Sequence, residues 1–324
     1  MKNILVTGAA GFIGSNLTLK LQELHPDARI VAMDDFRSGS FKNLQGFKGD
    51  FVAADLSRLD WQKQFKDLAF DAIFHEASIT DTTEHDQFLQ SHDNIEAFRR
   101  LLEFAEPHLT PIVYASSAAT YGISSTAEVN REDQPPAPAN VYAFTKVQLD
   151  NLGRAAARKS PAWRIVGLRY FNVYGPREQH KGRMASVIHH FTKQLKDTGT
   201  IRMFVGSGGF ADGEQRRDFV FVKDLALINR FFGGLLHDSP SKPVQAVVNA
   251  GTGQARTFKA VAEALMHVHG QSKIEFIPFP GDLMNRYQHY TQADIVGLRN
   301  AGYAGRFTEL EDGIKQTFAE EPVA

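Results

Sequence analysis

Cysteine is absent from the 324 residues of this sequence, which excludes a disulfide framework and a thiolate metal site. No run of about 18 apolar residues is present that could span a bilayer, and the N-terminal MKNILVTGAAGFIG lacks the separate apolar stretch and cleavage site of a signal peptide. The net charge is only −1, without the excess of Lys and Arg that nucleic-acid-binding proteins concentrate. We therefore expect a cytoplasmic protein that binds a small molecule, with neither nucleic acid nor a membrane as its partner.

Two common kinds of catalytic site are also missing. His75 and Glu76 begin like the zinc motif H-E-x-x-H, but the second histidine is replaced by Ile79. No serine lies between the two glycines of the G-x-S-x-G elbow that hydrolases use. We predict neither a metal site nor a serine hydrolase.

Strand-like and helix-like segments alternate through the first half of the chain. The composition predicts strands at 3–8, 28–35, 70–78, 111–118 and 164–170, and helices at 15–24, 94–106 and 142–158. Strand-like composition returns at 217–225 and 246–253, and a helix-like segment ends the chain. This alternation is typical of parallel strands joined by helical crossovers, so we predict an α/β fold with a doubly wound parallel sheet, the Rossmann type.

The pattern weakens after Asn172, where residues 172–218 are rich in Gly, Arg and His. We interpret this stretch as part of a smaller α/β substrate-binding lobe. The expected division is 1–171 and 219–253 for the dinucleotide-binding lobe, and 172–218 and 254–324 for the substrate-binding lobe.

A glycine loop, TGAAGFIG, follows the first predicted strand and opens a helix, with Gly8, Gly11 and Gly14 at three-residue intervals. Glycine permits a tight turn and lets the backbone approach a pyrophosphate, which the positive end of the helix dipole stabilises. The spacing differs from the commoner G-x-G-x-x-G, but its position after an N-terminal strand favours a dinucleotide site over a purely structural turn.

The end of the second strand bears on which dinucleotide is bound. The separation in sequence between the glycine loop and Asp34 is typical of an acidic residue that binds the adenosine ribose. Carboxylates such as Asp35 repel a 2′-phosphate, whereas Arg37, Lys42 and Arg58 would attract one, so the residues leave both dinucleotides open. We expect NADP, with NAD possible.

A tyrosine and a lysine lie one helical turn apart, Tyr142 and Lys146. A phenol with a pKa near 10 needs help to act as a base, and a nearby ammonium and a cationic nicotinamide ring can lower that pKa. The spacing also occurs by chance in many helices. Ser117, at the end of a predicted strand, supplies the deciding context, because its hydroxyl could bond a substrate oxygen and share a proton with the tyrosine.

With these motifs the sequence resembles the extended short-chain dehydrogenase/reductase superfamily, through TGAAGFIG, FHEAS, YASSAATYG, VYAFTK and RYFNVYGPRE. The resemblance implies that Ser117, Tyr142 and Lys146 are catalytic and that members act on nucleotide-linked sugars. Including the residues above, the implied cofactor contacts are Gly8, Gly11, Phe12, Ile13, Gly14, Asp34, Asp35, Arg37, Lys42, Asp55, Glu76, Ala77, Ser78, Asn94, Lys146, Val173 and Lys181.

Two features narrow the sugar chemistry. Ala118 and Ala119 stand where dehydratases place Asp-Glu, and a methyl group can neither donate nor accept a proton, so dehydration is disfavoured. Segments 171–186, 213–226 and 277–295 resemble the ADP-glyceromanno-heptose 6-epimerase family. That resemblance implies inversion at C6 of the heptose by transient oxidation and re-reduction with a retained nicotinamide cofactor, for lipopolysaccharide core assembly.

Delivery of hydride to both faces of the planar ketone requires this intermediate to turn in the site. The resemblance implies that Tyr142 is the acid–base group for one orientation of the intermediate and Lys181 for the other. It also implies a homo-oligomer, possibly a homopentamer. The implied substrate contacts are Ser117, Asn172, Arg183, His190, Phe204, Val205, Gly206, Ser207, Arg217 and Tyr287.

Several alternatives remain open at this point. Lys181 could be a loop lysine that meets phosphate, Arg217 could form a surface ion pair with Asp218, and Phe204 and Tyr287 could be core aromatics. Arg183 stands where some family members carry serine, which leaves open whether a modified heptose is used. For the whole chain the rivals are a C4 sugar-nucleotide epimerase and a dinucleotide-binding protein without turnover.

Overall fold

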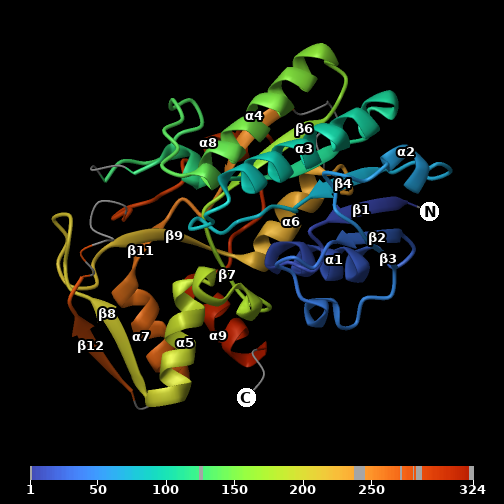
Figure 1. Ribbon diagram of the computed structural model, residues 1–324. Coiled ribbons are helices and arrows are strands. Elements are labelled where there is room, and N and C mark those ends of the chain that lie inside the picture. Colours follow the sequence, from blue (N-terminus) through green and yellow to red (C-terminus); the bar gives the residue numbers. More distant parts are fainter. Residues whose placement is uncertain are drawn as a thin grey trace.

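The computed structural model describes residues 2–123, 127–236, 245–270, 272–279, 281 and 287–320 (Figure 1). Its strands are β1 (Asn3–Thr7), β2 (Arg29–Asp34), β3 (Asp50–Ala53), β4 (Ala72–His75), β5 (Ile112–Ser117), β6 (Ile165–Tyr170), β7 (Asn172–Tyr174), β8 (Thr200–Phe204), β9 (Arg216–Phe221), β10 (Gln245–Ala250), β11 (Ala255–Thr257) and β12 (Lys273–Ile277). Its α-helices are α1 (Phe12–Leu24), α2 (Trp61–Gln64), α3 (Gln87–Ala105), α4 (Val141–Lys159), α5 (Val187–Thr198), α6 (Val222–Phe232), α7 (Phe258–His269), α8 (Val296–Asn300) and α9 (Leu310–Glu320). Short 3₁₀ helices lie at η1 (Phe41–Leu44), η2 (Glu106–His108), η3 (Ala118–Tyr121) and η4 (Gln179–Met184).

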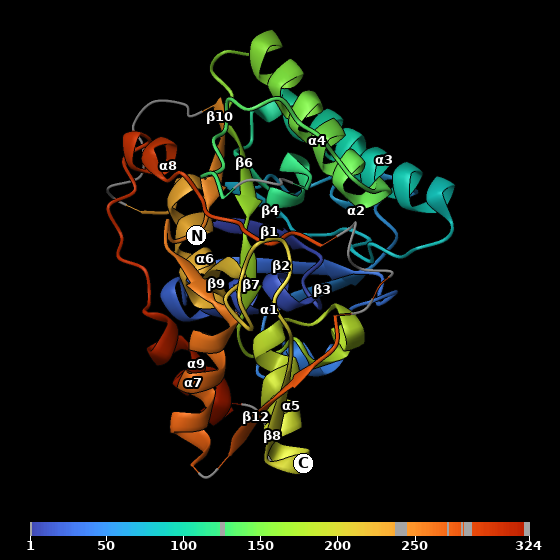
Figure 2. The ribbon, with the colours of Figure 1, turned by 90° about the vertical axis from the view of Figure 1, so that its left-hand side faces the viewer.

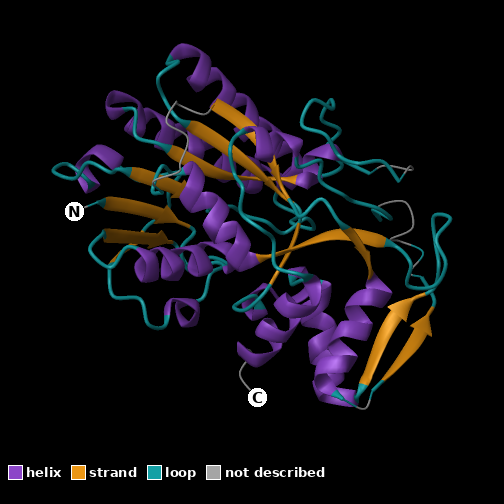
Figure 3. Ribbon diagram, turned by 180° about the vertical axis from the view of Figure 1, so that it is seen from behind, coloured by secondary structure: helices purple, strands orange, loops and turns teal. Residues whose placement is uncertain are grey.

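Seven parallel strands form the central sheet, in the order β10-β6-β5-β4-β1-β2-β3. Strand order reverses direction at β1, so chain connections run outward on both sides of it. The helices α3 and α4 cover one face and α1 and α6 the other (Figures 1 and 3). The predicted doubly wound α/β sheet is confirmed, and its carboxyl edge beside β1 is where such sheets bind dinucleotides.

Side-chain alternation along the strands builds a hydrophobic core on each face of this sheet. In β1, Ile4 and Val6 pack toward α1 and α6, whereas Leu5 packs toward α3 and α4. All three are fully buried. A strand apolar on both faces is what a sheet covered by helices on both sides requires.

A second, smaller unit lies beyond the carboxyl edge of the sheet. Strands β11-β9-β7 form one small sheet, β12 and β8 pair in parallel as another, and α5, α7 and α9 pack with them around a third core (Figures 1 and 2). The expected lobe boundary between 218 and 219 falls inside β9. The division into two lobes stays a prediction.

Several predicted elements differ in extent from those observed. The helix expected from Asn94 begins seven residues earlier, at Gln87, because the Asp86 carboxylate accepts a hydrogen bond of 2.8 Å from Leu89 N and caps it. The strand-like interpretation of 217–225 is wrong for its last four residues, since the strand ends at Phe221 and α6 begins at Val222. Part of segment 277–295, namely 280 and 282–286, lies outside the described residues.

Two searches of the described residues bear on other classes of function. None of their helices is both long and apolar enough to cross a membrane. Nor do they hold any group of three His, Cys, Asp or Glu side chains arranged to bind a metal ion.

Candidate functional site

The glycine loop joins β1 to α1 and has no room for side chains at two of its positions. Gly8 has φ +66°, and a Cβ there would lie 2.5 Å from the backbone nitrogen of Ala77. A Cβ on Gly14 would lie 2.0 Å from the carbonyl oxygen of Gly8. The loop therefore packs directly against the end of β4 and the first turn of α1, which leaves its open side to a ligand.

The first turn of α1 fits a pyrophosphate. The helix starts at Phe12 with Gly11 as its N-cap, and within the described residues no side chain caps it and no acidic residue lies in its first turn. Unfilled amides and the helix dipole favour an anion at this end. Ser78, just after β4, has a buried hydroxyl without a hydrogen-bond partner among the described residues, as expected for a group that a bound molecule would satisfy. These residues fit a dinucleotide cofactor.

The predicted ribose ligand Asp34 also has a structural role. Its carboxylate accepts hydrogen bonds from Ala10 N at 2.9 Å and from Phe36 N at 2.8 Å, so it ties the glycine loop to the end of β2. Burial raises the pKa of Asp34, against the effect of these backbone bonds. Asp35, Arg37 and Asp55 form an ion-pair cluster beside it, and Lys42 lies in η1.

Ser117, Tyr142 and Lys146 meet at the carboxyl end of β5. Ser117 ends that strand, Tyr142 lies in the first turn of α4, and the Asn140 side chain caps this helix by accepting from Ala143 N at 2.8 Å. Lys146 Nζ lies 5.6 Å from the centroid of the Tyr142 ring and donates to Ala115 O at 2.8 Å. The structure brings the three predicted catalytic residues together.

Without a bound ligand, burial has the largest effect on the pKa values of Tyr142 and Lys146. Burial raises the pKa of Tyr142, and a hydrogen bond with Ser117 acts in the opposite direction. Burial also lowers the pKa of Lys146 to about 8, although the carboxylates of Glu76 and Asp150 oppose the shift. The chain by itself therefore does not give the acidic phenol expected from the tyrosine–lysine spacing, so the cationic ring of a bound nicotinamide would have to supply that effect.

Glu76, the residue after β4, has a buried carboxyl group next to this trio. One oxygen accepts from Tyr170 at 2.8 Å, Tyr170 in turn accepts from Asn229 at 2.8 Å, and the other oxygen has no partner among the described residues. Burial raises the pKa of Glu76 to about 7. Asn94, another predicted cofactor contact, hydrogen-bonds both backbone groups of Ile79 and so holds the chain that follows β4.

Lys181 lies in η4, which crosses the N-terminal end of α1. Its Nζ is 5.3 Å from the centroid of the Phe12 ring, so it lies beside the end of the glycine loop. Burial lowers the pKa of Lys181, against the attraction of the Glu178 carboxylate. Val173, in β7, pairs with Val220 of β9. Ile13 follows Phe12 in α1 and packs against the core below the loop.

Arg217, in β9, is a buried guanidinium without a carboxylate partner among the described residues. It is 6% exposed, donates to Arg216 O at 2.9 Å, and lies over the Phe258 and Tyr287 rings at 5.6 and 5.0 Å. Burial lowers the pKa of Arg217 to about 10. The alternative of an ion pair with Asp218 is wrong, because Asp218 points to the other face and accepts from Thr252, Gly253 and Ala293.

A chain of aromatic rings leads away from this arginine through Tyr287. Phe204 lies 5.1 Å from Phe279, which lies 5.0 Å from Tyr287, measured between ring centroids. Neither Phe204 nor Tyr287 belongs to the hydrophobic core of the small lobe, so the core-aromatic alternative does not describe them. The neighbouring turn is held by backbone and hydroxyl groups: Val205 N donates to Ile277 O, Gly206 N donates to Asp212, and Ser207 bonds Gln215 and His289.

The remaining predicted substrate contacts lie in β7, η4 and α5. Asn172 begins β7 and accepts from Thr291 at 3.1 Å. Arg183 is exposed and pairs with Asp81 at 3.2 Å, and the His190 ring contacts the Arg183 carbonyl at 3.3 Å. Arg183 therefore connects η4 to the loop after β4, which also carries Ser78.

Sequence reasoning missed several groups in this region. Glu178 precedes Lys181 by three residues, and that helical spacing was an available signal for a charge partner. No such sequence signal pointed to Asp93 in α3 or to Asn229 in α6, because their partners, Arg37 and Tyr170, are far away in the sequence.

Comparisons with known proteins agree with this geometry. An ADP-L-glycero-D-manno-heptose-6-epimerase of Alkalilimnicola ehrlichii is 43% identical over 320 residues, covering 96% of this chain and 95% of the relative. The solved Helicobacter pylori ADP-L-glycero-D-manno-heptose-6-epimerase is 36% identical and superposes with a TM-score of 0.85, covering 98% of this chain and 95% of that one. A UDP-N-acetylglucosamine 4-epimerase from Methanobrevibacter ruminantium shares the fold at 24% identity and a TM-score of 0.84, with 98% and 97% covered. The model of the NAD dependent epimerase/dehydratase family matches residues 4–250, most of the chain, and this protein therefore belongs to that family of nicotinamide-dependent sugar-nucleotide enzymes.

Proposed function

We propose that this protein is an isomerase that interconverts ADP-D-glycero-D-manno-heptose and ADP-L-glycero-D-manno-heptose at C6. The two heptose epimerase relatives support this substrate. The observation that carries the mechanism is that two candidate acid–base groups lie next to the cofactor-binding elements. Tyr142, with Lys146 over its ring, lies at the carboxyl end of β5, and Lys181 lies over the Phe12 ring at the start of α1.

A C–H bond beside a plain hydroxyl is too weak an acid to lose a proton at neutral pH. When bound, the nicotinamide supplies reversible hydride acceptance, through which the C6 alcohol passes to a ketone and back. Tyr142 takes the C6 hydroxyl proton in one presentation, helped by its hydrogen bond with Ser117 and by Lys146. Lys181 gives a proton back to the oxygen when the turned ketone presents its other face.

Lys181 suits the second role because its proton is loosely held. Burial lowers the pKa of its ammonium, and the attraction of the Glu178 carboxylate opposes that shift. A cationic cofactor ring nearby would push it further in the same direction. A solvated loop lysine would carry no such shift.

The diphosphate of the nucleotide sugar has a natural partner in Arg217. A buried guanidinium without a carboxylate partner in the described part of the chain is costly unless an anion joins it. Its planar fork binds two phosphate oxygens at once. Tyr287 beside it, and Phe204 further along the same aromatic cluster, offer ring faces to a base. Asn172, Arg183 and His190 complete the substrate side of the proposal.

Turnover without added cofactor tests the proposal. The purified protein is incubated with ADP-D-glycero-D-manno-heptose alone, and NMR of the product follows inversion at C6. The Tyr142→Phe and Lys181→Met variants should each lose about 100-fold or more in turnover. Lys193→Met serves as the control, because Lys193 is an exposed lysine in α5 that pairs with Asp197. Near-normal turnover of Lys181→Met would refute the second-base role.

The same assay separates the rivals. Inversion of UDP-galactose at C4 would favour the C4 epimerase, and retention of cofactor without turnover of either sugar would favour a binding protein. Deuterium from solvent at C6 would contradict internal hydride return. The division into two lobes and the homo-oligomer, possibly a homopentamer, stay predictions.

A further inference from the structure

Arg37 is the cation closest in sequence to the predicted adenosine ribose ligand, and carboxylates surround it. It pairs with Asp93 at 2.5 Å, with Asp35 at 3.1 Å and with Asp55 at 3.3 Å. Asp55 also pairs with the exposed Arg58 at 3.5 Å. The cluster therefore contains three carboxylates and two guanidinium groups, and the carboxylate of Asp34 lies next to it in the sequence.

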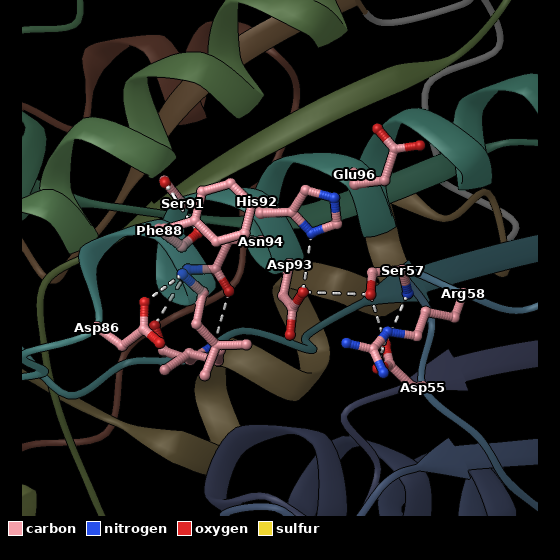
Figure 4. Close-up of polar contacts among 12 residues, drawn as sticks. Asp55, Ser57, Arg58, Asp86, Phe88, Ser91, His92, Asp93, Asn94 and Glu96 are labelled. Atoms are coloured by element: carbon pink, nitrogen blue, oxygen red, sulfur yellow. Dashed lines mark hydrogen bonds and ion pairs between the residues drawn. The ribbon is translucent and has the colours of Figure 1, made fainter.

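Other groups hold this cluster in place. Ser57 donates to Asp55 at 2.7 Å and to Asp93 at 3.3 Å, and the His92 ring contacts Asp93 at 3.0 Å (Figure 4). Burial acts to raise the pKa of Asp93, but hydrogen bonds from His92 and Arg37 outweigh it, so the pKa is lowered and the side chain is ionised at neutral pH. Asp93 is 7% exposed and belongs to α3, which the sequence pattern did not link to the glycine loop.

The cluster adjoins the dinucleotide site. Asp35 follows Asp34, whose carboxylate binds the glycine loop through Ala10 N at 2.9 Å. Phe36, at φ +58° and with its ring 5.1 Å from that of Phe51, fixes the turn that carries Arg37. The carboxyl ends of β2 and β3 are where the adenosine ribose lies in folds of this type.

We propose that the adenosine end of this site selects NAD over NADP, because Asp93, Asp35 and Asp55 already neutralise Arg37 and leave excess negative charge where a 2′-phosphate would lie. A 2′-phosphate brings a charge of about −1.5 to −2. It would have to draw Arg37 away from three carboxylates and then remain beside them. A ribose 2′-hydroxyl brings no charge and can donate to a carboxylate. This proposal replaces the sequence-based expectation of NADP.

Binding measured without sugar tests it, so its failure is distinct from failure of the proposed heptose activity. The cofactor retained from expression is extracted and identified by mass spectrometry, and the stripped protein is titrated with NAD and with NADP by calorimetry. We expect NAD in the extract and a Kd for NAD about tenfold or more below that for NADP, with a smaller ratio at high salt. Equal or tighter binding of NADP would overturn the proposal.

Matched variants test which residues are responsible. Asp35→Asn and Asp93→Asn each remove one charge and should each shift the Kd ratio toward NADP by about tenfold. Asp50→Asn is the control, because Asp50 pairs with Arg29 at 2.7 Å at the other end of β3. An unchanged ratio in both cluster variants would refute the assignment, and the partly exposed Asp35 keeps the test valid if Asp93→Asn folds poorly.

Discussion

Replacing Arg217 with methionine should stabilise the ligand-free protein while removing its response to ADP. Burial lowers the pKa of this guanidinium from 12.5 to about 10, which corresponds to a cost of about 3 kcal/mol for the charged form. The variant would lose two ring contacts, with Phe258 and Tyr287, of about 0.5–1 kcal/mol each. The net expectation is a gain of about 1–2 kcal/mol in the free energy of unfolding.

Thermal unfolding with and without ADP measures both effects. Arg217→Met should raise Tm by roughly 1–3 °C without nucleotide. Saturating ADP, at about 100 times its Kd, should stabilise the wild type by about 2.7 kcal/mol and leave the variant unchanged. Arg216→Met, which removes the exposed neighbouring guanidinium, is the control and should shift stability by less than about 0.5 kcal/mol.

Two outcomes would refute this reasoning separately. A lower Tm for Arg217→Met would mean that the buried charge is compensated within the protein, so that the guanidinium is a structural group. An undiminished ADP response would mean that the diphosphate binds elsewhere. Higher stability together with lost ADP binding is the result expected for a binding site in which a buried charge lowers the free energy of unfolding of the ligand-free protein.

Two further changes follow from the glycine loop and from Glu76. Gly14→Ala would place a Cβ 2.0 Å from Gly8 O, so it should lower Tm and abolish retention of cofactor. Gly281→Ala is the control, because no atom of the described residues lies within 4 Å of its added Cβ and its φ lies outside the left-handed region; it should cost less than about 1 kcal/mol and keep the cofactor. Equal losses in the two variants, measured by melting and by bound nucleotide, would contradict the close-packing argument. The pKa of Glu76 is raised by burial from 4.5 to about 7, so the folded protein holds a proton that the unfolded chain releases, and stability should fall by up to about 3 kcal/mol as pH rises from 4.5 to 7. Denaturant unfolding across that range should show a flatter profile for Glu76→Gln than for the wild type, and parallel profiles would refute the assignment.

The sequence by itself determined the fold class and the residues whose spacing along the chain is short. The alternation of strands and helices, the three glycines before α1 and the four-residue step from Tyr142 to Lys146 are local patterns. Each depends on neighbours within a few residues, so the physics of one turn or one strand is enough to interpret it. The same locality explains why element ends were less certain, since a cap such as Asp86 acts through a single hydrogen bond.

Only the tertiary structure decided how charges are shared. Arg37 meets Asp93 across 56 positions of sequence, and Tyr170 meets Glu76 across 94. Glu76 and Tyr170 meet because parallel strands bring their carboxyl ends to one edge, whatever the length of chain between them. Asp93 reaches Arg37 from α3, the helix that follows β4 in the chain. Alternation along β9 turns Arg217 away from Asp218, its neighbour in sequence, and toward the Phe258 and Tyr287 rings. Whether a cationic side chain has an anionic partner depends on residues far away in the sequence. The sequence therefore identifies the charged residues but does not show which of them pair.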